Sequence, residues 1–339
     1  MKHNDLVLEV LEAREARQAD RRQFIKVAGA STAVLAGASF LSACSSNDGK
    51  GGIITPSPTP TPTPTPAAIT DADVLNFALN LEYLEAQFYS YAAFGVGLPA
   101  ALLTGTGTQG AVTGGRQVVF GDPLVAQYAR EIAADEQAHV RFLRTAIGAT
   151  AVAQPAIDIG SMSTGAFSSA AVAAGLITQG QSFDPYASDE AFLLGAYIFE
   201  DVGVTAYKGA SPLITNKTFL EAAAGILAAE AYHAGLVRTV LYRKGISTPT
   251  VMIGNSTIIE ATEKVSTARD SLDGASDLDQ GVRAIGTSSN IVPTDSSGLA
   301  YSRSAGQVLN IAFLNRMATD RGGFFPNGVN GSIRLSAAN

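Results

Sequence analysis

The chain lacks tryptophan altogether, and it has only one cysteine and three histidines in 339 residues. A single cysteine excludes a framework of intramolecular disulfide bonds. Charged residues make up only 16% of the chain and carry no basic surplus, because the net charge is −7. Nucleic acids need a basic face opposite their phosphates, so we expect no nucleic-acid partner. Hydrophobic residues, by contrast, make up 46% of the chain, which is enough to bury a sizeable core.

Long hydrophobic runs are also missing. The most apolar stretch follows "DRRQFIKV" and ends at Cys44, and it is short for a membrane span, which needs ~20 strongly apolar residues. It is typical of the apolar part of a cleaved export signal. The pair Arg21 and Arg22, followed by "QFIK", resembles the twin-arginine export signal. We therefore expect residues 1–43 to be a signal peptide.

The apolar stretch ends in "LSAC", which resembles a lipobox, the motif whose cysteine is lipidated and becomes the mature N-terminus. A plain signal that happens to contain Cys44 is the alternative. The following "PSPTPTPTPTP" favours extended polyproline II, because alternating proline forbids helix and sheet. Residues 44–70 are therefore expected to be a lipidated cysteine and a Pro/Thr-rich linker. They would hold an exported domain on a membrane surface, in the periplasm or at the cell surface. A linker without a special role is the alternative.

The folded part begins near residue 71 and follows the 3.6-residue period of helices. N-cap residues precede the predicted helices, and each helix meets a glycine, the usual left-handed C-cap. Two long connections and two antiparallel pairs favour an all-α fold, a four-helix bundle with long crossover connections over residues 71–245. The predicted helices occupy residues 71–94, 122–148, 189–209 and 218–245, with a short helix near 167–176.

Residues 246–339 form a C-terminal extension. Amphipathic helices are predicted from Ser256 onward and over residues 303–318. The extension has no histidine and no clustered carboxylates at core spacing. We therefore expect it to pack on the bundle or to cover one end of it.

Two predicted helices place a carboxylate and an imidazole where the pattern requires core residues. Glu136 and His139 lie on the apolar stripe of the second helix, and Glu230 and His233 lie at the same depth in the fourth. Both pairs have the spacing Glu-x-x-His, which puts the two side chains on one helix face.

The first and third helices also match each other. Each carries one glutamate on its apolar stripe and a tyrosine seven residues later: Glu82 with Tyr89, and Glu200 with Tyr207. The chain thus resembles a helix pair used twice. This weak internal repeat places four glutamates and two histidines around one pseudo-twofold axis.

One buried Glu–His pair on its own would more often be an ordinary hydrogen bond of the core. Here both histidines outside the leader belong to such pairs, and four carboxylates share one core. Desolvating each carboxylate costs several kcal/mol, so either the pKa values rise until the groups are neutral or positive charge lies between them. Two divalent cations balance four carboxylates. Carboxylate and imidazole ligands without thiolate suit iron or manganese and also admit zinc.

Two assignments have alternatives. Glu85 lies one turn after Glu82 and is a possible ligand in its place, but Glu82 matches the pattern of the third helix. Tyr89 and Tyr207 are either hydrogen-bond donors to ligand carboxylates or ordinary aromatic core residues.

The order Glu, Glu-x-x-His, Glu, Glu-x-x-His over four helices resembles the ferritin-like di-iron carboxylate superfamily. "NLEYLEAQFY", residues 80–89, looks like the first-helix segment of ferritins and bacterioferritins. The tail segments "YSRSAGQVLNIAF" and "GGFFPNGVNGSI" resemble the C-terminal end of the desiccation-related protein family. The likeness covers about residues 71–333. It implies a dinuclear site with six ligands: Glu82, Glu136, His139, Glu200, Glu230 and His233.

The signal indicates export, and the resemblance implies two divalent metal ions, iron first and manganese second, that react with oxygen or peroxide in oxidative or desiccation stress. The activity would be that of a di-iron oxidase or ferroxidase, or a peroxide disproportionation like that of manganese catalases. The alternative is a non-catalytic protein at the cell surface that the metal stabilises. The long loops, the tether and the extension do not fit iron storage in a ferritin shell. Whether the chain forms an oligomer stays open.

Overall fold

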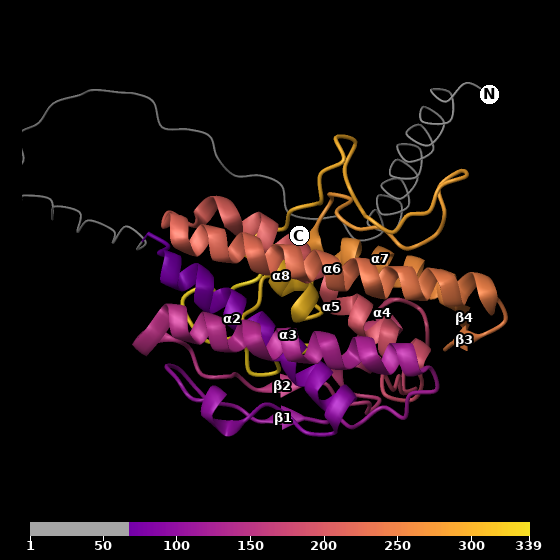
Figure 1. The fold of residues 1–339 in the computed structure, drawn as a ribbon, viewed down its shortest axis with the longest axis horizontal. Helices are drawn as coiled ribbons and strands as arrows, with labels where there is room; N and C mark the ends of the chain where they lie inside the picture. The colour runs from indigo at the N-terminus through magenta and orange to yellow at the C-terminus, as the bar shows by residue number, and fades with distance from the viewer. Residues whose placement is uncertain (1–67) are drawn as a thin grey trace, which may run out of the picture.

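The computed structural model describes residues 68–339 (Figure 1). The predicted signal peptide, Cys44 and nearly all of the Pro/Thr-rich linker lie outside these residues. The all-α prediction is confirmed, because four long helices dominate the fold. They are α2 (Asp71–Phe94), α3 (Pro123–Ile147), α5 (Asp189–Ala210) and α6 (Lys217–Ser247). Among the described residues, no helix combines the length and the apolar character needed to cross a membrane.

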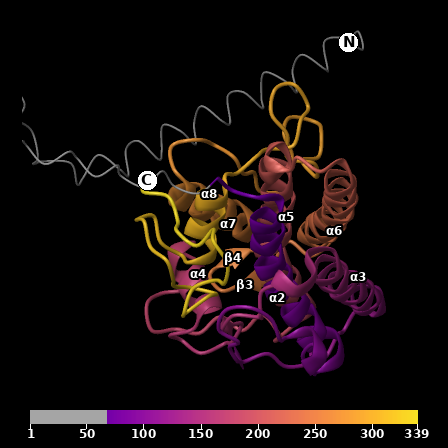
Figure 2. The same cartoon turned by 90° about the vertical axis from the view of Figure 1, so that its left-hand side faces the viewer.

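The four helices pack as two pairs, α2 with α3 and α5 with α6. Figure 2 shows α2 and α5 between the outer helices α3 and α6 and the C-terminal part of the chain. Their sequences explain this placement. In α2, 18 of 24 residues are buried, and in α5 18 of 22, whereas α3 buries only 8 of 25. A helix that is apolar all round belongs inside, and an amphipathic one belongs at the surface.

Several predicted helix ends are confirmed. Thr70 caps α2 in a capping box with Asp73, and Gly95 ends that helix in the left-handed conformation, with φ 75°. Asp122 caps α3, whose first residue is proline, and Ser188 caps α5. Each cap side chain accepts a hydrogen bond from a backbone N–H that has no partner within the helix.

Two predicted glycine caps are wrong, although both helices end within two residues of them. The predicted cap Gly209 lies inside α5, where its missing side chain admits the chain at Arg303, since a Cβ there would lie 1.9 Å from the Arg303 carbonyl oxygen. Gly245 lies inside α6 for a similar reason, because a Cβ there would lie 2.6 Å from a side-chain carbon of Ile259. The start of α6 agrees with the prediction to within one residue: the helix begins at Lys217, and the Asn216 side chain caps it.

The long connections have some structure of their own. The α2–α3 connection contains the 3-10 turn η1 (Ala100–Leu102) and strand β1 (Val112–Thr113). The α3–α5 connection contains η2 (Gly148–Thr150), strand β2 (Ile157–Asp158) and helix α4 (Ala166–Ala173), which confirms the predicted short helix. The two strands pair in parallel, with Val112 opposite Ile157, and so tie the two connections together.

The C-terminal part follows η3 (Ser211–Leu213) and α6. It comprises a hairpin of β3 (Met252–Ile253) and β4 (Ser256–Thr257), then α7 (Ile258–Asp273) and α8 (Ala305–Ala312). The helix predicted over residues 303–318 is shorter than expected. It stops at Ala312 because Leu314 adopts a left-handed backbone, with φ 53°.

Buried ion pairs join the extension to the bundle. Arg303, fully buried, donates to Asp273 at 2.6 Å, to Asp279 at 3.1 Å and to the Thr205 hydroxyl of α5 at 3.0 Å. Arg269 donates to Asp279 at 2.6 Å and to Asp201 of α5 at 3.1 Å. The expectation of no carboxylate cluster in the extension is therefore wrong. Its aspartates lie inside because arginines from distant segments neutralise them.

Candidate metal centre

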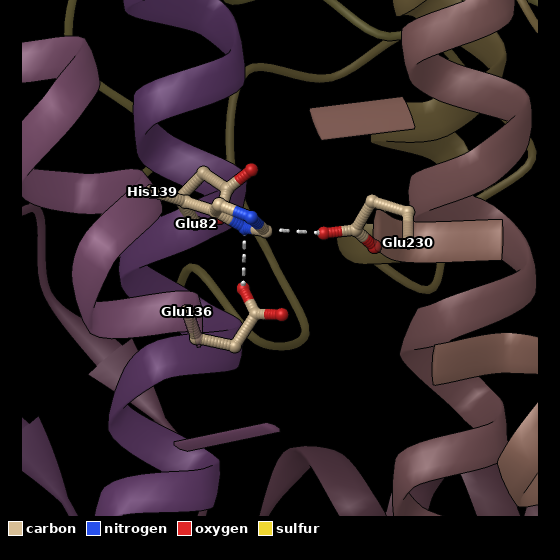
Figure 3. A group of neighbouring side chains, drawn as sticks. All are labelled: Glu82, Glu136, His139 and Glu230. Atoms are coloured by element: carbon tan, nitrogen blue, oxygen red, sulfur yellow. Dashed lines mark ion pairs between the residues drawn. The ribbon is translucent and has the colours of Figure 1, made fainter. Parts of the chain in front are cut away.

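The structure brings the two Glu-x-x-His pairs and the two single glutamates together in the bundle core. The i,i+3 spacing puts each histidine above its own glutamate on the inner face of α3 or α6. Figure 3 shows Glu82, Glu136, His139 and Glu230 converging on one point. All four glutamates are at most 1% exposed. Of the two histidines, His139 is the more accessible, with 12% of its side chain exposed.

The side chains form two groups that share Glu136. One group comprises Glu82, Glu136, His139 and Glu230, and the other comprises Glu136, Glu200 and His233. His139 Nδ1 lies 3.2 Å from Glu82, 3.6 Å from Glu136 and 3.7 Å from Glu230. His233 Nδ1 lies 3.1 Å from Glu136 and 3.8 Å from Glu200. Each group has the size and composition of one ion's ligand set.

The glutamates divide into two kinds according to what their oxygens contact. Tyr207 of α5 donates a hydrogen bond to Glu82 Oε1, and Tyr89 of α2 donates one to Glu200 Oε1. Glu82 and Glu200 therefore each keep one oxygen for the centre. Both oxygens of Glu136 and both oxygens of Glu230 form no hydrogen bond. The first kind suits a ligand to one ion, and Glu136, which belongs to both groups, suits a bridge between two.

The centre is electrostatically frustrated without cations. Burial, with the charge of Glu136 added, raises the pKa of Glu82 to about 7. Burial likewise raises the pKa of Glu200 to about 8, although the charge of His233 opposes the rise. Burial also opposes ionisation of Glu136, but the imidazoles of His139 and His233, at 3.6 and 3.1 Å from its oxygens, lower its pKa to about 2. One carboxylate thus stays ionised between two imidazoles while its neighbours hold protons.

The histidines complete this picture. Burial disfavours the charged imidazole, but Glu136 and Glu82 outweigh it and raise the pKa of His139 to about 11. Glu136 and Glu200 raise the pKa of His233 to about 9 in the same way. Two imidazolium ions would thus partly replace the positive charge that two metal ions supply.

The donor atoms themselves test whether metal fits. Eight buried oxygens and nitrogens, at least one from each of the six residues, form no hydrogen bond with any described residue. Buried polar atoms without partners are rare, and they cluster where an ion or water completes the site. Four carboxylates and two neutral imidazoles match the charge of two divalent ions. The residues therefore fit a dinuclear carboxylate centre, while the assignment of each ligand stays a prediction.

Glu85, the alternative ligand, lies outside both groups. It is buried on α2 and faces a small apolar cavity between α2, α5 and α8. Burial raises the pKa of Glu85 well above its usual range, and the charges of Glu136 and Glu200 add to the rise.

Sequence reasoning missed Asp135. Its carboxylate lies 3.1 Å from His233 Nε2, on the side of the ring opposite Nδ1, which faces the centre. Asp135 is about half exposed, so the apolar stripe of α3 gave no reason to place it near the site. A carboxylate on the outer ring nitrogen fixes the tautomer and the orientation of a metal-binding imidazole.

Changing Asp135 to asparagine should weaken one of the two metal positions. His233 would lose the partner that fixes its tautomer, so the affinity of that position should fall by roughly 10–100-fold. Isothermal titration of metal into the apo-protein measures both affinities. The control is Glu131→Gln, which removes an exposed carboxylate of the same helix. Equal affinities in wild type and D135N would mean that Asp135 does not orient His233.

The metal-free protein should lose stability as the pH rises from about 5 to above 9. The pKa values of Glu82 and Glu200, about 7 and about 8, exceed the ordinary 4.5, and those of His139 and His233, about 11 and about 9, exceed 6.5. Each group binds its proton more tightly when folded, so its contribution is complete at low pH and is lost as the pH passes the folded pKa.

Metal should reverse this dependence, because ions displace these protons and bind more tightly as the pH rises. Melting temperatures at pH 6 and pH 8.5, with chelator and with added metal, measure both effects. A metal-free protein that melts at a higher temperature at pH 8.5 than at pH 6 would contradict the assignment of these pKa values.

Comparison with known proteins agrees with this geometry. A family model described as the ferritin-like domain matches residues 70–243, which contain all six predicted ligands. The chain belongs to the ferritin-like family. No solved structure matches it significantly.

Two curated relatives of this ferritin-like chain align over most of their length. The chain is 29% identical to the ferritin-like catalase Nec2 of Nesocodon mauritianus, over 78% of the chain and 84% of the relative. It is 30% identical to the desiccation-related protein PCC13-62 of Craterostigma plantagineum, over 77% of the chain and 83% of that relative. Both alignments are longer than the ferritin-like domain and so include part of the C-terminal extension.

Proposed function

We propose that the protein binds two iron or manganese ions in this centre and disproportionates hydrogen peroxide to water and dioxygen. The observation that carries the proposal is the set of eight buried donor atoms without a hydrogen bond, which come from two groups of side chains that share Glu136. The ferritin-like catalase among the relatives supports peroxide as the substrate. A role in oxidative or desiccation stress is supported by the name of the other relative.

When bound, two ions that each change oxidation state by one supply or accept the two electrons of each half-reaction. One peroxide takes up two electrons and two protons and becomes two waters, and a second releases two electrons and two protons and becomes dioxygen. The protein's own residues hold the centre during this exchange. Glu136 would offer its two oxygens to both ions and Glu230 would hold one of them, while the tyrosine hydroxyls hold Glu82 and Glu200 in place.

Peroxide needs a polar route to the centre, and we propose that it approaches from the α3–α6 side. His139 reaches the surface there, and the half-exposed Asp135 lies nearby on α3. The exposed groups on this side can hydrogen-bond to peroxide as they do to water.

Oxygen evolution from peroxide by protein loaded with manganese or iron tests the proposal. Oxygen evolution is compared between H233N, which lacks one imidazole of the centre, and E131Q, a control with a change at the surface. Turnover should require close to two ions per chain, fall at least a hundredfold in the first variant and stay unchanged in the second. Two bound ions that raise the melting temperature without any turnover would favour the alternative, a non-catalytic protein that metal stabilises.

We also propose that the chain is exported by the twin-arginine route and anchored through lipidated Cys44. The support is the sequence pattern around Arg21 and Arg22. Changing both arginines to lysine should leave the precursor in the cytoplasm, and Cys44→Ser should release the protein from membranes. Cell fractionation measures both, and unchanged membrane location in the double variant would exclude this route.

A further inference from the structure

A small cavity lies beside the metal centre, on the face of α2 and α5 that the C-terminal extension covers. Its volume is about 30 Å³. The extension closes the cavity with Val308, Ile311 and Ala312 of α8 and with the ring of Phe324. Apart from Glu85, all of its lining residues are apolar.

The cavity comes close to the centre at a glycine. Gly203 of α5 lines the cavity, and a Cβ at that position would lie 2.5 Å from Glu230 Oε2 and 3.4 Å from Glu85 Oε1. No side chain can stand at this point without displacing Glu230. The cavity and Glu230 of the centre therefore both lie against the backbone of Gly203.

The outer wall of the cavity is fixed. The Phe324 N–H donates to the carbonyl of Ala312 at 2.9 Å, and the Phe324 carbonyl accepts from Asp158 N–H at 3.0 Å. Its ring packs edge-on against Phe199 of α5, with centroids 4.9 Å apart. The buried ion pairs of Arg303 hold the chain just before α8. The cavity is thus a property of the folded chain rather than of a loosely packed surface.

The lining selects its occupant by polarity. A cavity needs roughly 10–15 Å³ to hold one water-sized molecule, so this one has room for a single small molecule. Water or hydrogen peroxide would need two to four polar partners, and the cavity offers one carboxyl. An apolar diatomic molecule needs none.

We propose that this cavity is a dioxygen-binding site next to the metal centre. The role of the site in turnover rests on the proposed function, because peroxide disproportionation releases dioxygen. The affinity of the cavity for an apolar gas is independent of that function. Figure 2 shows α3 and α6 on the opposite side of α2 and α5 from α8. Peroxide thus enters on one side of α2 and α5, and dioxygen is held on the other.

Xenon, an apolar probe of similar size, tests the site without metal. Crystals or solutions of the full-length protein under xenon pressure should show one bound atom between Gly203 and Ala312. Ala312→Leu fills the cavity and should weaken xenon binding at least tenfold, while V308A enlarges it and should at least preserve binding. The matched control A305L makes the same change on the same helix, away from the cavity. A wild-type protein that takes up no xenon at this position would overturn the proposal.

A kinetic comparison tests the link to the centre. Protein loaded with reduced iron is mixed with dioxygen or with peroxide, and oxidation is followed optically. With dioxygen, the gas takes two electrons from the two ions and two protons from solvent and becomes hydrogen peroxide. Ala312→Leu should slow this oxidation at least tenfold and leave oxidation by peroxide within twofold of wild type. If the variant reacted with dioxygen at the wild-type rate, the cavity would have no role in the reaction. Equal slowing of oxidation by dioxygen and by peroxide would indicate a distorted centre. Xenon binding by a protein without peroxide turnover would leave the site in place and refute only the proposed function.

Discussion

Replacing Glu136 with alanine is expected to abolish binding at both metal positions at once. Glu136 is the one residue shared by the two groups, and its two oxygens face the two histidines from the same point. Removing it takes away the bridge and leaves three carboxylates for two ions. Metal content, measured by elemental analysis after loading and gel filtration, should fall from about two ions per chain to near zero.

Two comparisons make this result specific. E131A removes an exposed carboxylate from the same helix and should retain full metal content. H233A removes a member of only one group and should keep more metal than the Glu136 variant. If the Glu136 variant retained one ion, the two positions would be independent and the bridge would not exist.

Replacing Arg303 with methionine is expected to cause a large loss of stability, although the residue lies outside the metal centre. The side chain is fully buried, and its loss would leave Asp273 and Asp279 with less positive charge around them. Breaking a buried ion pair by removing one partner costs about 3–5 kcal/mol. The melting temperature should therefore fall by about 10 °C.

The loss of stability caused by Arg303→Met should also depend on pH. Burial already raises the pKa of Asp273 to about 6, although Arg303 opposes the rise. Without the arginine this pKa rises further. At pH 5 the aspartate can be neutral at little cost, whereas at pH 8 either the buried charge or its protonation lowers the stability of the fold. Unfolding followed by circular dichroism should show the greater loss at pH 8.

A control for the charge alone is R321M. Arg321 pairs with Asp320, and both side chains are more than half exposed. A surface pair contributes at most about 1 kcal/mol. Similar losses in the two variants would mean that the buried network does not hold the extension in place.

Local sequence patterns carry most of the fold and of the metal centre. The helical period and the cap residues indicate four long helices, and the Glu-x-x-His spacing places its two side chains on one face whatever the neighbouring helices do. Because the same pattern occurs twice, the sequence alone brings six residues to one depth of a bundle. The structure places all six there.

Features that depend on distant segments could not be predicted in this way. Gly209 looked like a helix end, but it is a contact point for Arg303, which lies 94 residues further along the chain. Asp279 of the extension is buried because Arg269 and Arg303 reach it from other elements, and no local sequence pattern indicates such a pairing. Asp135 was missed because its side chain reaches His233 from the exposed side of its helix.

The crossed tyrosine contacts have a consequence for the ancestry of the fold. Tyr89 of the first helix pair holds a glutamate of the second, and Tyr207 of the second holds a glutamate of the first. Neither hairpin alone contains a finished half of the centre, but two copies of one hairpin would build the whole of it by twofold symmetry. Fusion of such copies into one chain frees them to diverge. The position before Glu230 is Ala229 where the other hairpin has Asp135, so only one histidine has gained an outer carboxylate from this position.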